Sequence, residues 1–181
     1  MTKQKKFIIA VAIQLAILFI IIITKVATLT GGTDVVLRIR PVDPRDPLRG
    51  DYVTFNYDIS SINSYIVRDV NEIKNGNTVY VALREAGKYW TALTVSVKKP
   101  ADGIFIKGKV VSGGVKNEGD IISPRQSSDI RIIYGIEEYF IPEGKGQDFV
   151  FGDKETVARV MVDKNGNPVL KQIYVDNNLW P

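Results

Sequence analysis

Residues 78–97 read TVYVALREAGKYWTALTVSV, and this stretch decides the fold class. Apolar and polar residues alternate on both sides of the segment 85–88 (EAGK), which is typical of two half-buried strands joined by a tight turn. β-Branched and aromatic residues, which fit the pleated surface of a sheet, dominate both halves. We therefore predict an antiparallel hairpin with strands over 78–83 and 89–97.

The same two-residue period recurs along most of the chain. Asn165-Gly166 lies between two apolar runs near the C-terminus, and this dipeptide predicts a hairpin in which both residues adopt positive φ. Besides an N-terminal helix, the pattern predicts only short helices, over 61–71 and 136–139. Many short strands with regular turns imply an all-β fold, an antiparallel sandwich or a partly open barrel. The remaining strands are predicted over 34–41, 52–57, 104–111, 130–134, 157–162 and 169–175.

A long apolar run precedes all of these strands. Phe7 to Thr24 (FIIAVAIQLAILFIIIIT) contains eighteen residues and no formal charge. A helix of about 20 apolar residues rises roughly 30 Å, which matches the hydrocarbon core of a bilayer. A secretory signal has a shorter apolar core and an A-x-A-like cleavage site. We therefore expect an uncleaved anchor that contacts the lipid bilayer through residues 7–24.

The charges beside this run predict its orientation. Lys3, Lys5 and Lys6 lie directly before it, and basic residues are less dense after it. Because basic residues stay preferentially on the cytoplasmic side, we expect a cytoplasmic N-terminus. The chain then divides into a cytoplasmic tip with a single-pass anchor in the cell membrane (1–27) and an extracytoplasmic β domain (28–181).

Composition narrows the classes of function. The formal net charge is +4, but residues 1–26 hold four of the 24 basic residues and none of the 20 acidic ones. The rest of the chain is therefore neutral, which argues against nucleic-acid binding. The absence of cysteine and histidine excludes disulfides, thiolate nucleophiles, ordinary zinc sites and catalytic imidazole. Asp163, Asn165 and Asn167 imitate a calcium loop, but Pro168 replaces the required glycine, so we expect no metal and no cofactor.

Two segments combine prolines or glycines with charges. Residues 40–52 (RPVDPRDPLRGDY) contain three prolines, which fix the backbone, among arginines and aspartates. This segment is either a salt-bridged surface loop or a preorganised recognition loop. Residues 134–146 (YGIEEYFIPEGKG) contain glycines that suit a phosphate cradle, but the spacing of a nucleotide-binding P-loop is missing.

Both segments carry a family resemblance. Residues 49–57 (RGDYVTFNY) resemble the signature of the GDYXXLXY family of bacterial membrane-anchored proteins, and residues 134–146 are similar to its second signature. Phe55 stands where the signature has leucine, which replaces one apolar residue by another. The resemblance implies a single-pass, extracytoplasmic β domain without an established activity. It also implies a multi-pass membrane protein as partner.

We expect from these features an interaction or accessory domain that partners an integral membrane protein. We expect Gly50, Asp51 and Tyr57 to lie near Glu137, Tyr139 and Glu143 in space. The candidate interaction residues lie in or beside the two signatures: Asp43, Arg45, Arg49, Gly50, Asp51, Tyr52, Tyr57, Glu137, Tyr139, Glu143 and Lys145.

Two alternatives stay open. One is an enzyme that uses carboxylates alone, because two carboxylates with separated pKa values suffice for acid–base chemistry. The other is a module that binds an anionic lipid or glycan through the arginines of residues 38–49. Residues 49–53 also look like the Gly-Asp turn of type I signal peptidases, but Val42 stands at the place of their nucleophilic serine, so any shared scaffold lacks the nucleophile. The carboxylates available to the first alternative are Asp43, Asp46, Asp51, Glu137 and Glu143.

Overall fold

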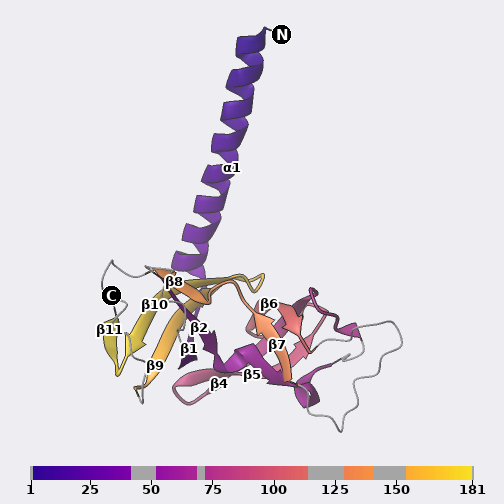
Figure 1. Cartoon of the computed structure of the whole chain (residues 1–181), viewed down its shortest axis with the longest axis vertical. Helices are drawn as coiled ribbons and strands as arrows, with labels where there is room; N and C mark the ends of the chain where they lie inside the picture. The colour runs from indigo at the N-terminus through magenta and orange to yellow at the C-terminus, as the bar shows by residue number, and fades with distance from the viewer. Residues whose placement is uncertain (1, 42–51, 69–71, 114–128, 141–153, 181) are drawn as a thin grey trace.

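The computed structural model describes residues 2–41, 52–68, 72–113, 129–140 and 154–180. One long helix, α1 (Lys3–Gly31), precedes the strands and extends away from the β domain (Figure 1). Two short 3₁₀ turns, η1 (Asp58–Ser60) and η2 (Ser64–Ile66), interrupt the strands. The strands are β1 (Thr33–Pro41), β2 (Tyr52–Tyr57), β3 (Ser61–Asn63), β4 (Thr78–Ala86), β5 (Tyr89–Ser96), β6 (Phe105–Ser112), β7 (Asp129–Ile133), β8 (Glu138–Phe140), β9 (Thr156–Val162), β10 (Pro168–Val175) and β11 (Asn178–Trp180).

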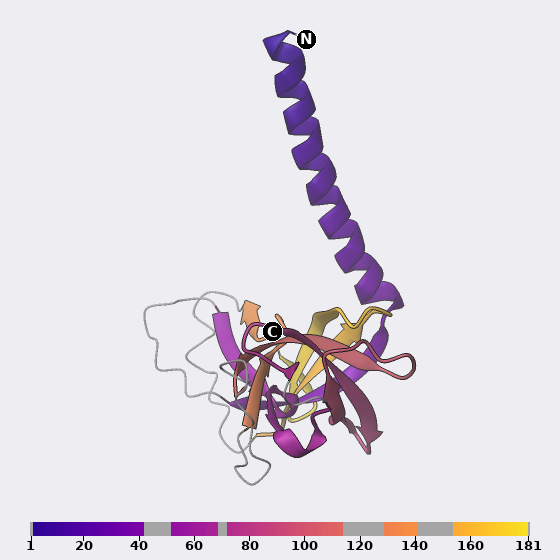
Figure 2. The same ribbon diagram turned by 90° about the vertical axis from the view of Figure 1, so that its right-hand side faces the viewer.

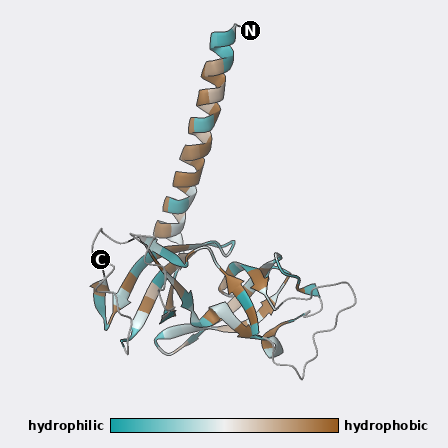
Figure 3. Cartoon of the chain, in the orientation of Figure 1, coloured by the Kyte–Doolittle hydropathy of each residue, from teal (hydrophilic) through white to brown (hydrophobic). Residues whose placement is uncertain are grey.

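α1 is apolar and exposed along most of its length. It contains the expected span 7–24, and its most apolar 18-residue window has a mean hydropathy of 3.0 with none of its residues buried. Figure 3 shows this stretch as an almost continuous hydrophobic band. A helix that is apolar on all sides does not fit a water-exposed surface. By length and composition, α1 therefore fits a membrane anchor or a signal sequence.

A single residue, Gly32, joins α1 to β1. Its N–H donates to the carbonyl of Thr28 at 2.9 Å. A Cβ at Gly32 would lie 2.6 Å from that carbonyl oxygen and 3.0 Å from the carbonyl oxygen of Val162 in β9. The Thr28 side chain is buried, although it belongs to the last turns of the helix. The helix therefore passes directly into the sheet, and only glycine fits the junction.

Eleven strands of the described chain form two antiparallel sheets. The six-stranded sheet has the order β11-β10-β9-β1-β2-β8, and the five-stranded sheet has the order β3-β7-β6-β4-β5. One sheet curves into a half-barrel and the other into a nearly closed barrel. Alternate residues of both sheets face one shared apolar core, whose largest fully buried side chains include Phe55, Tyr57 and Leu37 from one sheet and Ile106 and Ile132 from the other. The prediction of an antiparallel all-β fold is confirmed.

Two predicted helices are wrong. Within 61–71 the described residues form β3 followed by the single turn η2, and within 136–139 the chain enters β8. Both short strands pair with a strand far away in the sequence, β3 with β7 and β8 with β2. A strand of three residues is too short to show a period of its own, which explains why the pattern did not reveal these strands or β11, although β11 pairs with its neighbour β10.

The predicted C-terminal hairpin is present, but its turn differs in conformation. The Gly166 N–H donates to the Asp163 carbonyl at 2.9 Å, and Gly166 has φ of 79°. Among the described residues other than glycine, positive φ occurs only at Asp176 and Asn177, so Asn165 does not share it. A longer loop with a single left-handed glycine therefore replaces the two-residue turn that Asn-Gly favours.

Candidate functional site

The described parts of the two signature segments, residues 52–57 and 134–140, lie on the two strands of one bent ribbon. On one side of the bend β2 pairs with β8, where Tyr52 faces Phe140. On the other side β3 pairs with β7, where Ser61 faces Arg131. Nine residues separate these positions on each strand, so the antiparallel register continues across the bend. We call residues 52–63 and 129–140 the corner ribbon, because this ribbon carries the chain from one sheet into the other.

Two buried tyrosines hold the bend from opposite strands. The Tyr57 hydroxyl donates to the carbonyl of Ile136 at 2.5 Å, and the Tyr134 hydroxyl donates to the carbonyl of Ile59 at 2.5 Å. Burial and the nearby negative charge of Glu137 raise the pKa of both phenols well above the ordinary value. Both side chains therefore stay neutral and keep their protons for these two bonds.

Glu137 organises the turn between β7 and β8. Its Oε1 accepts the N–H of Tyr134 at 2.5 Å, and its Oε2 accepts the N–H groups of Gly135 at 2.8 Å and Ile136 at 2.9 Å. Its backbone carbonyl also accepts the N–H of Phe55 at 3.0 Å. These three backbone N–H groups engage both oxygens of the Glu137 carboxylate, and this arrangement gives Glu137 a structural role. It does not favour Glu137 as the general acid of a carboxylate enzyme.

An open groove lies against the corner ribbon. We call it the corner groove; its volume is about 710 Å³. Thr54 and Asn56 of β2 line it from one sheet, and Arg131 and Ile133 of β7 line it from the other. The guanidinium of Arg131 donates to the Asn56 side-chain oxygen at 3.4 Å, which connects the two sheets across the groove. The other lining residues lie at the end of β6, in the turn before β8 and at the start of β8: Val111, Ser112, Gly135, Glu137 and Glu138.

The groove combines an apolar surface with separated charges. Val111 is 41% exposed and Ile133 is 40% exposed, although both are large aliphatic residues. Arg131 supplies a positive charge and Glu138 a negative one, and both residues are exposed. Such a surface suits an extended polypeptide segment, which offers apolar side chains together with backbone donors and acceptors.

The family of the chain follows from comparison with known proteins. The family model described as GDYXXLXY protein matches residues 14–173. The chain belongs to the GDYXXLXY family. The matched region begins inside α1 and extends into β10, so it includes more than half of the helix together with the corner ribbon. The comparison with curated proteins finds no match, and the comparison with solved structures finds none either.

The structure places part of the GDYXXLXY signature in the core. Phe55 and Tyr57 are buried, and their rings meet edge to face at a centroid distance of 5.6 Å. Tyr52 pairs through its backbone in β2, and Tyr139 is half-buried beside Trp180, with ring centroids 5.6 Å apart. The other candidate interaction residues lie outside the described part of the chain: Asp43, Arg45, Arg49, Gly50, Asp51, Glu143 and Lys145. Asp46, a candidate for the carboxylate enzyme, lies outside it as well.

Sequence reasoning missed most of the residues that line the groove. Thr54 and Asn56 alternate with buried residues of β2, and Arg131 and Ile133 alternate with buried residues of β7. The two-residue period therefore marked them as outward-facing. It did not reveal that the outward faces of two separate sheets meet, because this depends on the pairing across the bend.

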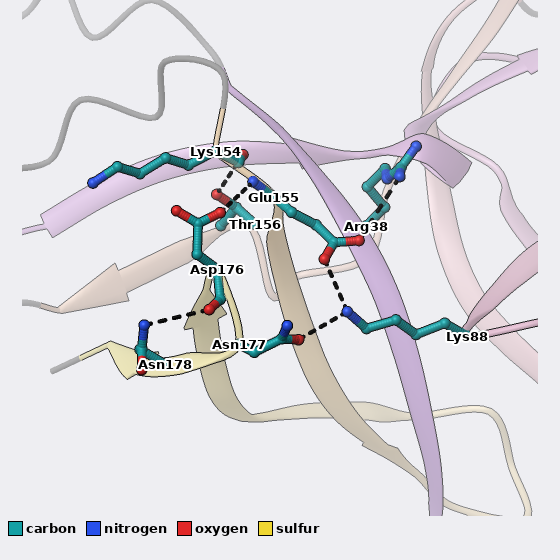
Figure 4. Close-up of polar contacts among 8 residues, drawn as sticks. All are labelled: Arg38, Lys88, Lys154, Glu155, Thr156, Asp176, Asn177 and Asn178. Carbon is teal, nitrogen blue, oxygen red and sulfur yellow. Dashed lines mark hydrogen bonds and ion pairs between the residues drawn. The ribbon is translucent and has the colours of Figure 1, made fainter.

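A second polar cluster lies between the sheets at another place (Figure 4). Lys88, in the turn between β4 and β5, donates to Glu155 at 2.8 Å and to the side-chain oxygen of Asn177 at 2.9 Å. Arg38 of β1 lies 4.0 Å from the same Glu155 carboxylate. We call these four residues the inter-sheet clamp. Because Lys88 and Arg38 share the Glu155 carboxylate, the clamp connects the β4–β5 turn to β1, to the start of β9 and to the β10–β11 turn.

Proposed function

We propose that this protein is a membrane-anchored, extracytoplasmic binding domain whose corner groove holds a segment of an integral membrane protein. The observation that carries the proposal is the direct junction between an exposed apolar helix and the β domain. A domain joined through Gly32 alone stays within reach of the membrane surface. Its nearest partners are therefore the extracytoplasmic loops of other membrane proteins.

Three observations favour a retained anchor over a cleaved signal. The family match includes α1 from residue 14 onward. The buried Thr28 and the contacts of α1 with β9 and β10 make the end of the helix part of the folded domain. Cleavage near the end of the apolar run would remove a helix turn that packs against these strands. The lysines at positions 3, 5 and 6 favour a cytoplasmic N-terminus.

Protease accessibility tests the topology. We expect that protease added to spheroplasts removes the β domain and leaves a short membrane-bound fragment that contains α1. The same protein in inverted vesicles should lose only its N-terminal tip. Complete protection of the β domain in spheroplasts, with digestion in inverted vesicles, contradicts the proposed orientation.

Site-specific crosslinking tests the groove. A photoreactive phenylalanine analogue at Ile133, which lines the groove, should crosslink to an integral membrane protein in native membranes. Leu93 is the matched control, because it is also a strand aliphatic, is 49% exposed and lies outside the groove lining. We expect a discrete adduct from position 133 that Arg131→Ala weakens, and none from position 93. Equal adducts from both positions, or adducts with soluble proteins alone, contradict the proposal.

A further inference from the structure

A second pocket lies at the base of α1. Gly31 and Thr33 line it from the helix end and the start of β1, and its volume is about 390 Å³. The loop between β5 and β6, with the first residue of β6, supplies residues 99–105 as one wall, and the end of β9 with the β9–β10 turn supplies residues 162–164 as another. Figure 2 shows this loop and this turn next to the base of the helix. We call this site the helix-base pocket.

The length of α1 places this pocket at the depth of lipid headgroups. If the hydrocarbon core begins at Phe7, about 20 residues cross its 30 Å and reach Val26. The five residues from Ala27 to Gly31 add about 7 Å, which is about the thickness of one headgroup layer. Because only Gly32 separates α1 from β1, the pocket stays at the depth of the headgroups.

The pocket offers two lysines to a ligand. Lys99 is positioned by a hydrogen bond to the Asn165 side chain at 3.1 Å and lies over the Phe105 ring at 5.6 Å. Lys164 also lines the pocket and directly precedes Asn165 in the β9–β10 turn. Neither lysine forms an ion pair in the described parts of the chain. Both ammonium groups therefore keep donors for an anion.

The two carboxylates beside these lysines differ in their availability. Burial alone would raise the pKa of Asp163, but hydrogen bonds from Asn167 and Asn165 lower it below the ordinary value. Its oxygens accept the Asn165 and Asn167 N–H groups at 2.8 Å each, so this charge is engaged within the turn. Asp102 is exposed at the rim and opposes an anion there.

We infer that the helix-base pocket binds the phosphate of an anionic phospholipid headgroup between Lys99 and Lys164. This inference rests on the proposed membrane anchoring but not on the corner groove. A lysine near an anionic membrane surface strengthens binding about fivefold. Removing both lysines therefore weakens binding about 25-fold, while Asp102→Asn strengthens it.

The first experiment tests the depth of the pocket. The chain has no cysteine, so a single introduced cysteine takes a fluorophore uniquely. In full-length protein in nanodiscs, a label at Ala101→Cys should be quenched strongly by lipids with a nitroxide on the headgroup. Ala86→Cys, at the end of β4, is the matched control: both alanines are exposed, and Figure 1 shows the β4–β5 hairpin at the end of the domain away from α1. Equal quenching at both positions overturns the inference.

The second experiment tests the chemistry of the ligand. Full-length protein in detergent, labelled at position 101, is titrated with dioctanoyl phosphatidylglycerol, dioctanoyl phosphatidylcholine and inorganic phosphate. We expect saturable binding of phosphatidylglycerol that Lys99→Gln with Lys164→Gln weakens by at least about tenfold, because each ammonium forms a charge-assisted hydrogen bond to the phosphate. Lys154→Gln, which changes an exposed lysine outside the pocket, should leave binding unchanged. Equal binding of both lipids, an unaffected double variant, or inorganic phosphate that binds as tightly as the lipid overturns the inference.

The outcomes separate this inference from the proposed function. Failure of the protein to integrate into nanodiscs would refute the membrane anchor, and with it both proposals. A protein that integrates and crosslinks through position 133, but shows no lipid preference, would refute the headgroup site alone.

Discussion

The hydroxyl group of Tyr57 stabilises the corner ribbon, and Tyr57→Phe removes only this group. The hydroxyl donates at 2.5 Å to the carbonyl of Ile136, and the ring is 1% exposed. Phenylalanine keeps the edge-to-face contact with Phe55, so the core stays filled. The loss of stability therefore reports on the hydrogen bond that joins the two signature segments.

The magnitude follows from the burial of this bond. A buried hydrogen bond contributes about 0.5–1.5 kcal/mol, and an acceptor left without its donor costs about 1–3 kcal/mol. We expect Tyr57→Phe to lower the free energy of unfolding by about 2 kcal/mol. Tyr134→Phe should act similarly, because its hydroxyl donates to the carbonyl of Ile59 in the same way. The double variant should depart from additivity by at least about 0.5 kcal/mol, because both bonds hold one ribbon.

Urea unfolding of the full chain in mild detergent measures this loss. Trp90 and Trp180 both belong to the β domain, so their fluorescence follows its unfolding and not that of α1. With a slope of about 2 kcal/mol per molar urea, Tyr57→Phe should move the midpoint down by about 1 M.

The control makes the same chemical change on the surface. Tyr65 is 70% exposed, and Tyr65→Phe should change the free energy of unfolding by less than about 0.5 kcal/mol. If Tyr57→Phe costs no more than Tyr65→Phe, the hydrogen bond to Ile136 does not stabilise the bend, and our account of the corner ribbon is wrong.

Three further predictions follow from the same contacts. Glu137→Gln should destabilise the protein by about 2 kcal/mol, because the amide presents donors to a turn that offers three N–H groups; unchanged urea unfolding contradicts this. Gly108→Ala should cost about 1–3 kcal/mol, since its Cβ would lie 2.4 Å from the Ile132 side chain; a stable, unshifted variant contradicts this. The free energy of unfolding should fall above pH 10 by up to about 1.4 kcal/mol per pH unit for each of Tyr57 and Tyr134, because the phenol of the unfolded chain releases its proton at a lower pH than the buried phenol. Urea unfolding at several alkaline pH values should show a smaller loss in Tyr57→Phe, and an equal loss contradicts this.

The sequence predicted the long strands well because each carries its own periodicity. The β4–β5 hairpin, for example, shows alternating burial along most of β4 and a glycine with positive φ at Gly87 in its turn. The apolar helix was equally clear, because eighteen uncharged residues leave no polar face. By contrast, β3 and β8 have three residues each and exist only through distant partners. Local propensity therefore assigned both regions to helices that do not form.

By itself the sequence determined the class of the protein: an apolar N-terminal helix followed by an antiparallel β domain, with two signatures that identify its family. These properties depend on residue type and spacing along the chain. The tertiary structure alone decided what the signatures do. Tyr57 and Ile136 are 79 positions apart, and no local pattern shows that a hydroxyl on one strand meets a carbonyl on the other. The bend, the groove beside it and the pocket at the helix base all arise from such long-range pairing, which depends on how the sheets fold onto one core.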